Sequence, residues 1–154
     1  MLTPRTLLCL VLPLLACEEE HLSDTIQVRY SANTVHHSQE TLDEAAELLG
    51  MEIRDLYTYE PGWAVRALVL PATNSVAGET FYLGKCARMV WSVDKGSSLA
   101  HELGHATGLQ HVDDPNNLMY PIPGDELTDQ QIHQMRRGAW TIQHCGLWQG
   151  RTTK

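Results

Sequence analysis

Three histidines fall within eleven residues of the chain, at positions 101, 105 and 111 of the stretch HELGHATGLQH. Four residues turn an α-helix by about 400°, so His101 and His105 project from the same side of one helix. A continuing helix would carry His111 roughly 15 Å along the axis and onto another face. Gly108 allows the chain to turn back instead, because glycine adopts the left-handed conformation that closes a helix. The spacing therefore predicts a helix that ends near Gly108 and a third histidine that folds back beside the pair.

Three imidazoles that converge in this way match the ligand set of a catalytic zinc site, which is tetrahedral and keeps its fourth position open. Glu102 follows the first histidine and is not needed as a ligand. Its carboxylate would lie beside the open position, where it can accept a proton from zinc-bound water and pass it to a leaving amine. The residues predict one zinc ion held by His101, His105 and His111. They also predict Glu102 as the general base of amide-bond hydrolysis.

Residues 101–111, in the form HExxHxxGxxH, resemble the extended zinc signature of the metzincin metallopeptidases. Residues 117–121 (NLMYP) resemble the Met-turn of those enzymes, which sets a methionine, here Met119, beneath the zinc-binding histidines. The wording GHATGLQH followed by LMYP is closest to the matrixins within that group. The resemblance implies a metzincin-like zincin domain and a zinc endopeptidase that acts on a protein or peptide substrate.

The resemblance also suggests where a substrate would bind. It implies that a peptide lies extended along an edge strand, which we place near residues 80–83. It further implies that the segment after the Met-turn, Pro121, Ile122 and Pro123, forms the wall of the pocket for the residue after the scissile bond. Because this wall is apolar, we expect cleavage before medium or large apolar residues.

Apolar periodicity and turn residues predict the remaining elements of the chain. Residues 25–30, 64–70, 80–83 and 88–93 read as strands, and helices are expected over about 38–49, 97–107 and 128–144. Ser38 and Thr128 are candidate N-caps, Gln131 completes a capping box, and Gly50 ends the first helix. The predicted fold is α+β, with a small mixed β-sheet, a backing helix, an active-site helix and a C-terminal helix. His36 and His37 could bind metal, but we expect them in a solvated turn.

The N-terminal segment predicts export and a lipid anchor. Arg5 precedes a short apolar run that cannot span a bilayer, which needs about 20 residues. The end of this run, from Leu14 to Cys17, resembles the bacterial lipobox, in which the cysteine carries lipid. We therefore expect a lipoprotein signal over residues 1–16 and a catalytic domain over residues 17–154. The mature protein would be anchored to a bacterial membrane at its periplasmic or cell-surface face. The alternative is an ordinary signal that is cleaved near Ala16.

Four cysteines are present, and this partition assigns each of them. Cys9 would leave with the signal and Cys17 would carry lipid, which leaves Cys86 and Cys145. Disulfides persist in exported proteins, so we predict a bridge between these two. Such a bridge closes a loop of about 60 residues and would stabilise the fold by roughly 3–4 kcal/mol. Two buried thiols are the alternative.

The acidic composition narrows the possible partners. A formal net charge of −8 argues against nucleic acid and against electrostatic binding to anionic lipid, so membrane attachment would depend on the lipid chain alone. We expect a monomer. A non-catalytic zinc-binding lipoprotein module and a peptidase restricted to cell-wall peptides remain the alternatives to a general endopeptidase. Glu102 favours an enzyme, because a binding module needs no base beside the metal.

Overall fold

The computed structural model describes residues 20–31, 33–56, 64–71, 77–83 and 87–145. None of the helices in these ranges has the length and apolar character that crossing a membrane requires. The signal segment and Cys17 lie outside the described residues, so their assignments stay predictions. Cys145 is not a free thiol, but Cys86 also lies outside these ranges, and the pairing of the two stays a prediction.

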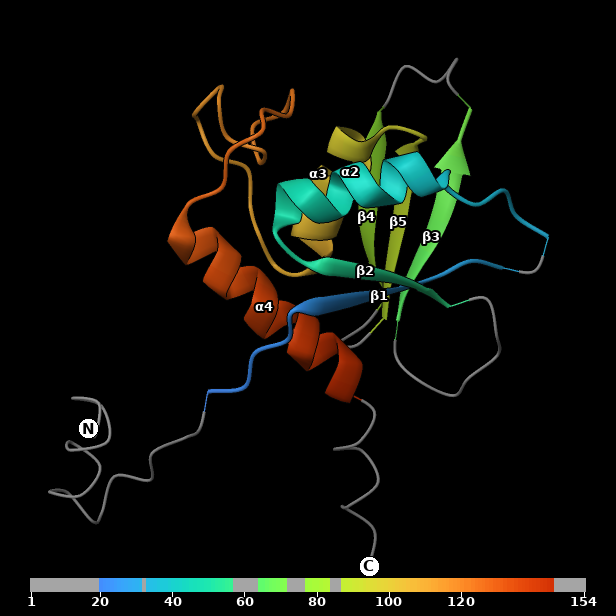
Figure 1. The fold of residues 1–154 in the computed structure, drawn as a ribbon, viewed down its shortest axis with the longest axis horizontal. Coiled ribbons are helices and arrows are strands. Elements are labelled where there is room, and N and C mark those ends of the chain that lie inside the picture. Colours follow the sequence, from blue (N-terminus) through green and yellow to red (C-terminus); the bar gives the residue numbers. More distant parts are fainter. Residues whose placement is uncertain (1–19, 32, 57–63, 72–76, 84–86, 146–154) are drawn as a thin grey trace, which may run out of the picture.

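A five-stranded mixed sheet forms the centre of the fold, with the strand order β2-β1-β3-β5-β4 (Figure 1). The strands are β1 (Thr25–Arg29), β2 (Glu52–Leu56), β3 (Val65–Leu70), β4 (Gly78–Leu83) and β5 (Ala87–Val93). Neighbouring strands run parallel except β4, which is antiparallel to β5 and lies at one edge of the sheet. The predicted strands and the α+β class are confirmed, whereas β2 was not predicted.

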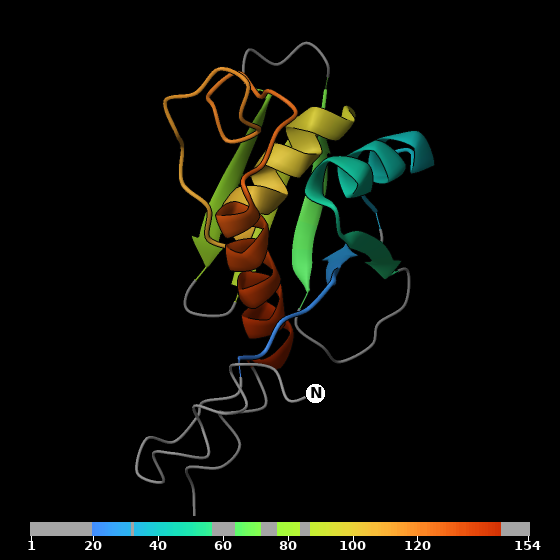
Figure 2. The ribbon, with the colours of Figure 1, turned by 60° about the vertical axis from the view of Figure 1, so that its left-hand side comes forward.

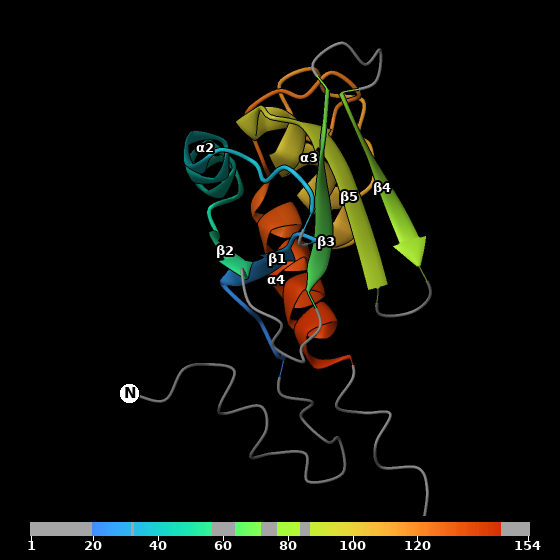
Figure 3. The same cartoon turned by 90° about the vertical axis from the view of Figure 1, so that its right-hand side faces the viewer.

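Three helices pack with this sheet: α2 (Gln39–Leu49), α3 (Gly96–Ala106) and α4 (Asp129–His144) (Figures 2 and 3). Burial alternates along β1, where Ile26 and Val28 are buried and their neighbours are only partly covered. Side chains two residues apart point to the same face of a strand, so one face of the sheet carries the core. The zinc-signature helix α3 packs on β4 and β5, at the end of the sheet away from β2.

Local capping signals in the sequence are confirmed at the helix ends. The Ser38 hydroxyl accepts a hydrogen bond from the Thr41 N–H at 3.3 Å at the start of α2. Gly50 closes α2 with a φ of 59°. Thr128 and Gln131 form the capping box of α4, each side chain bonding the backbone N–H of the other residue. These contacts fix both ends of α2 and the start of α4.

Neighbouring helices hold α3 at both ends. Its N-cap residue, Lys95, gives no side-chain hydrogen bond, and the Glu44 carboxylate of α2 accepts from the Gly96 N–H at 3.2 Å instead. At the other end, Gly138 of α4 lies so close that a Cβ there would sit 1.9 Å from the carbonyl oxygen of Thr107. The helix that carries two of the histidines is therefore fixed by α2 and α4 together.

His37 is buried, with 3% of its surface exposed, so the expectation of a solvated turn is wrong for this residue. Its Nδ1 lies 2.6 Å from the Tyr30 hydroxyl and its Nε2 lies 2.8 Å from the Ser92 hydroxyl. Because both ring nitrogens have hydrogen-bond partners, the imidazole can be buried at little cost. Burial lowers the pKa of His37, an effect that Asp94 partly opposes.

Candidate metal centre and cleft

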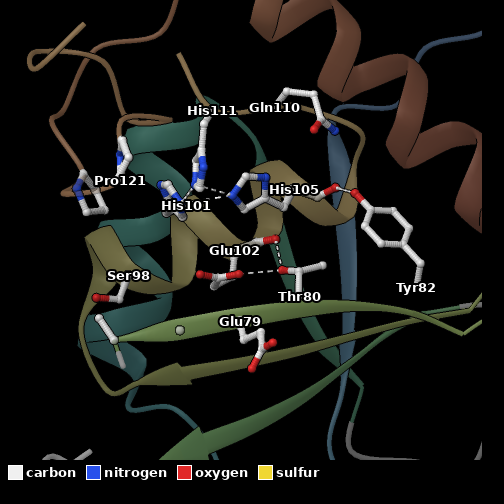
Figure 4. Close-up of a pocket in the computed structure, with 13 residues that line it drawn as sticks. Glu79, Thr80, Tyr82, Ser98, His101, Glu102, His105, Gln110, His111 and Pro121 are labelled. Carbon is white, nitrogen blue, oxygen red and sulfur yellow. Dashed lines mark hydrogen bonds between the residues drawn. The ribbon is translucent and has the colours of Figure 1, made fainter. Parts of the chain in front are cut away.

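The three histidines converge on one point beside α3 (Figure 4). The Nε2 atom of His101 lies 3.1 Å from that of His105 and 3.2 Å from that of His111, and the remaining pair is 3.1 Å apart. Tetrahedral zinc with Zn–N bonds near 2.0–2.1 Å separates its ligand nitrogens by about 3.3 Å. The triangle of nitrogens thus has the size that a zinc ion requires. In the part of the chain that the structure describes, these histidines are the one group of this kind.

Gly108 ends the helix and brings the third histidine back, as its position in the sequence predicts. Its φ is 107°. The Gly108 N–H donates to the His105 carbonyl and the Leu109 N–H donates to the Gly104 carbonyl, at 2.9 and 3.0 Å. These two bonds are those of a Schellman motif. The side-chain amide of Gln134 on α4 donates to the Gly108 carbonyl at 2.7 Å and holds the turn from outside.

Backbone carbonyls orient two of the rings. His101 Nδ1 lies 2.7 Å from the Leu118 carbonyl oxygen, and His105 Nδ1 lies 2.9 Å from the Leu109 carbonyl oxygen. A carbonyl only accepts, so each Nδ1 carries the proton and each Nε2 presents a lone pair. Lone pairs that face each other at about 3 Å repel unless a cation lies between them. The donor set therefore fits a zinc ion, and it includes the outer hydrogen bonds typical of zinc-bound histidines.

Electrostatics favour the neutral ligand form of His101. Burial lowers its pKa, and the nearby His105 and His111 lower it further, whereas the bond to the Leu118 carbonyl has the opposite effect. His101 is 5% exposed. A neutral imidazole is the form that binds zinc.

Glu102 lies beside the triad with 6% of its surface exposed. Its carboxylate oxygen Oε2 accepts a hydrogen bond from the Thr80 hydroxyl at 2.6 Å. Burial raises the pKa of Glu102, while the bond from Thr80 and the nearby His105 lower it. A carboxylate with a raised pKa is a better proton acceptor near neutral pH, which suits the predicted general base.

A cleft of about 600 Å³ opens over the triad, between α3 and the edge strand β4. Its walls include His101, Glu102, His105 and His111, together with Gly78, Glu79, Thr80 and Tyr82 from β4. Of the predicted pocket wall, Pro121 and Pro123 line the cleft. Ile122 does not line it, and its side chain is 78% exposed. The predicted strand near residues 80–83 is confirmed as an edge strand and forms one side of the cleft.

Met119, in the predicted Met-turn, is fully buried and lies against Gly104 of α3. Its Sδ atom would lie 2.6 Å from a Cβ at position 104, so Gly104 leaves the room for it. The Asn117 side chain accepts from the Met119 N–H at 2.9 Å and also bonds Gln131 of α4. This loop supplies the Leu118 carbonyl that orients His101.

Sequence analysis did not single out the residues of β4 that face α3. The Thr80 hydroxyl reaches Glu102, and the Tyr82 hydroxyl donates to the His105 carbonyl. Gly78 lies two residues earlier on the same face. Alternation along the predicted edge strand would have placed these side chains together, but the helix that they contact lies about twenty residues further along the chain.

Comparisons with known proteins found one family match and similar solved structures. Residues 71–137 match the family model described as Matrixin (Peptidase_M10). A solved structure of a zinc-dependent peptidase from Methanocorpusculum labreanum is similar over 71% of this chain and 99% of its own, at 16% identity and a TM-score of 0.44. No curated protein matches the sequence. The segment that matches the family model contains the histidine triad, and together they support a zinc-dependent peptidase.

Proposed function

We propose that this protein is a zinc-dependent endopeptidase of the metzincin type. One observation carries the proposal: three Nε2 atoms within 3.2 Å of one another share a cleft with the buried carboxylate of Glu102. A binding module needs the histidines but gains nothing from a carboxylate beside them. Burying a carboxylate costs free energy unless it is paired and hydrogen-bonded, so its presence here favours a catalytic role.

Each residue has a defined task in peptide hydrolysis. His101, His105 and His111 would hold the zinc ion, which when bound lowers the pKa of water and polarises a carbonyl. Glu102 accepts a proton from the water that attacks the carbonyl carbon. As the C–N bond breaks, Glu102 returns that proton to the leaving nitrogen, so the reaction ends with a free acid and a free amine.

The edge strand β4 supports a peptide as substrate. Its outer backbone groups face away from β5 and can pair with an extended chain, which is how many proteins bind peptides. The cleft runs beside this edge and is lined by Gly78, Glu79, Thr80 and Tyr82. A peptide paired with β4 would thus lie next to the triad.

Replacing Glu102 tests the proposal most directly. Glu102→Gln keeps the size of the side chain but cannot accept the proton, so kcat should fall by about 10²–10⁴ while zinc content stays at one ion per chain. The assay compares wild type and variant on mixed protein and peptidoglycan substrates. Equal cleavage by both would remove Glu102 as the base. Cleavage of peptidoglycan peptides alone would restrict the activity to the cell wall. An inert but zinc-loaded wild type would indicate a binding module.

We also propose an apolar preference for the residue after the scissile bond. Pro121 and Pro123 line the cleft, and no Lys or Arg is among the described residues around it. An apolar side chain buried there gains roughly 1.5–3 kcal/mol, whereas an acidic one finds no basic partner among the described residues of the cleft. A peptide-library cleavage profile measures this, and a preference for Asp, Lys or Arg at that position would contradict it.

Lipid at Cys17 is our proposal for cellular location. Its support is the apolar run that ends at Cys17. The protein would then face the periplasm or the cell exterior, as a monomer. Cys17→Ala should release the protein from the membrane fraction. A mature N-terminus found by mass spectrometry downstream of Cys17, without lipid, would refute the proposal.

A further inference from the structure

The two carboxylate oxygens of Glu102 have different surroundings on β4. Oε2 lies 2.6 Å from the Thr80 hydroxyl. Oε1 points to Gly78, where a Cβ would lie only 2.6 Å from it. Thr80 and Gly78 are two residues apart on the strand, so they point to the same face of the sheet, toward α3. Figure 4 shows Thr80 next to Glu102. One oxygen therefore has a hydrogen-bond donor, and the other packs against Gly78 without one.

The Thr80 hydroxyl has one proton and two acceptors within reach. It lies 2.9 Å from the backbone carbonyl oxygen of Glu102 and 2.6 Å from Oε2. Distances of 2.5–2.7 Å are typical of a hydroxyl that donates to a charged carboxylate. The proton thus goes to Oε2. The contact with the Glu102 carbonyl keeps the Thr80 hydroxyl against the same turn of α3. The hydroxyl therefore stays next to the Glu102 side chain.

The space at Gly78 belongs to the side chain of Glu102. A Cβ at this position would also meet the Glu102 Cγ at 2.6 Å and Cδ at 2.9 Å. Contacts this short force the carboxylate to move. Any larger residue at position 78 would therefore displace the Glu102 side chain.

We propose that Thr80 is a positioning residue for Glu102, which it holds by Oε2 so that Oε1 is the oxygen that exchanges protons in the cleft. The inference rests on the proposed peptidase function. A glutamate has three rotatable bonds, so a carboxylate without an anchor samples several rotamers. Thr80 selects one of them, and Gly78 leaves room for that rotamer. A base displaced by about 1 Å can lose about 100-fold in rate.

Two substitutions at the same position separate the hydroxyl from the shape of the side chain. Thr80→Val keeps the branched shape but removes the donor, and Thr80→Ser keeps the donor. We expect Thr80→Val to lower kcat by about 10- to 100-fold with KM and zinc content unchanged, and Thr80→Ser to restore most of the rate. Thr141→Val is the matched control, because the Thr141 hydroxyl bonds the Arg137 carbonyl within α4, outside the cleft. It should cleave like wild type.

A crystal structure of the zinc-loaded Thr80→Val protein gives a readout that does not depend on activity. We expect the Glu102 carboxylate to leave its wild-type rotamer or to split between two. Wild-type kcat in Thr80→Val, or an unmoved carboxylate in its crystal structure, would overturn the inference. A wild-type protein without peptidase activity would instead defeat the proposed function, while the carboxylate position would still report on the Thr80 contact.

Discussion

The histidine side chains of α3 are oriented by hydrogen-bond partners that lie outside this helix. His101 and His105 are oriented by carbonyls of Leu118 and Leu109, which both lie beyond the helix. His111 lies beyond the helix altogether. Residue types and spacing predicted that these three histidines lie together, because four-residue spacing and a glycine have direct geometric consequences. The partners of Glu102 could not be predicted in this way, since Thr80 and Gly78 reach it across the sheet edge.

Removal of the third ligand is the sharpest test at the residue scale. His111→Ala should lower the zinc content well below one ion per chain, because two imidazoles on a helix bind zinc more weakly than three. Metal analysis after gel filtration measures the content. His133→Ala is a suitable control, since His133 lies on α4 and pairs with Glu20 instead. Full zinc occupancy in His111→Ala would refute the three-ligand site.

Among the elements, those with capping residues were predicted almost to the residue. The capping residues each bond to backbone groups only a few positions away, so the local sequence determines where the helices begin or end. These residues are Ser38, Gly50, Thr128 and Gln131. The strand β2 was missed because it alternates too few apolar residues, with only Ile53 and Leu56 among five. It forms by pairing with β1 in parallel, and such pairing depends on distant residues.

Substitutions at two glycines with positive φ distinguish an effect on stability from an effect on zinc binding. Gly50 and Gly108 have φ values of 59° and 107°, and neither faces a close atom that would block a Cβ. Alanine at either position should lower the free energy of unfolding by about 1 kcal/mol or more, through backbone strain. Only Gly108→Ala should also lower zinc affinity, because it moves His111. Denaturation curves and zinc titrations of both variants measure this. Equal zinc affinity in the two would contradict the role of the turn.

Across the whole molecule, the polar cluster around His37 joins segments that are far apart in the sequence. Its hydroxyl partners are Tyr30, next to β1, and Ser92 on β5. Asp94, Asp55 and His36 lie near enough to affect the pKa of His37. The sequence predicted a solvated turn here because neither partner is a neighbour in the chain. The burial of His37 depends on the tertiary structure, which brings β5 and the residue next to β1 together around it.

Buried His37 makes stability depend on pH. Its pKa in the folded protein lies below the ordinary value of 6.5, so below pH 6.5 the unfolded chain binds a proton that the folded chain excludes. Stability present above pH 6.5 is therefore lost as the pH falls, by up to about 1.4 kcal/mol per pH unit for one proton. Urea unfolding of wild type and His37→Gln between about pH 7.5 and 5.5 tests this. The same slope in both proteins would rule His37 out as the cause.

The exposed edge of β4 could also lead to self-association of the protein. Its outer backbone groups, beside exposed Tyr82 and Leu83, could pair with a second copy of the chain as well as with the proposed peptide substrate. Edge-to-edge self-association would block the cleft from both copies. Glu79 on the strand and a net charge of −8 oppose such pairing by repulsion. The net negative charge thus opposes self-association of the chain. The outer edge of β4 can then stay exposed, although most folded proteins protect such edges from aggregation.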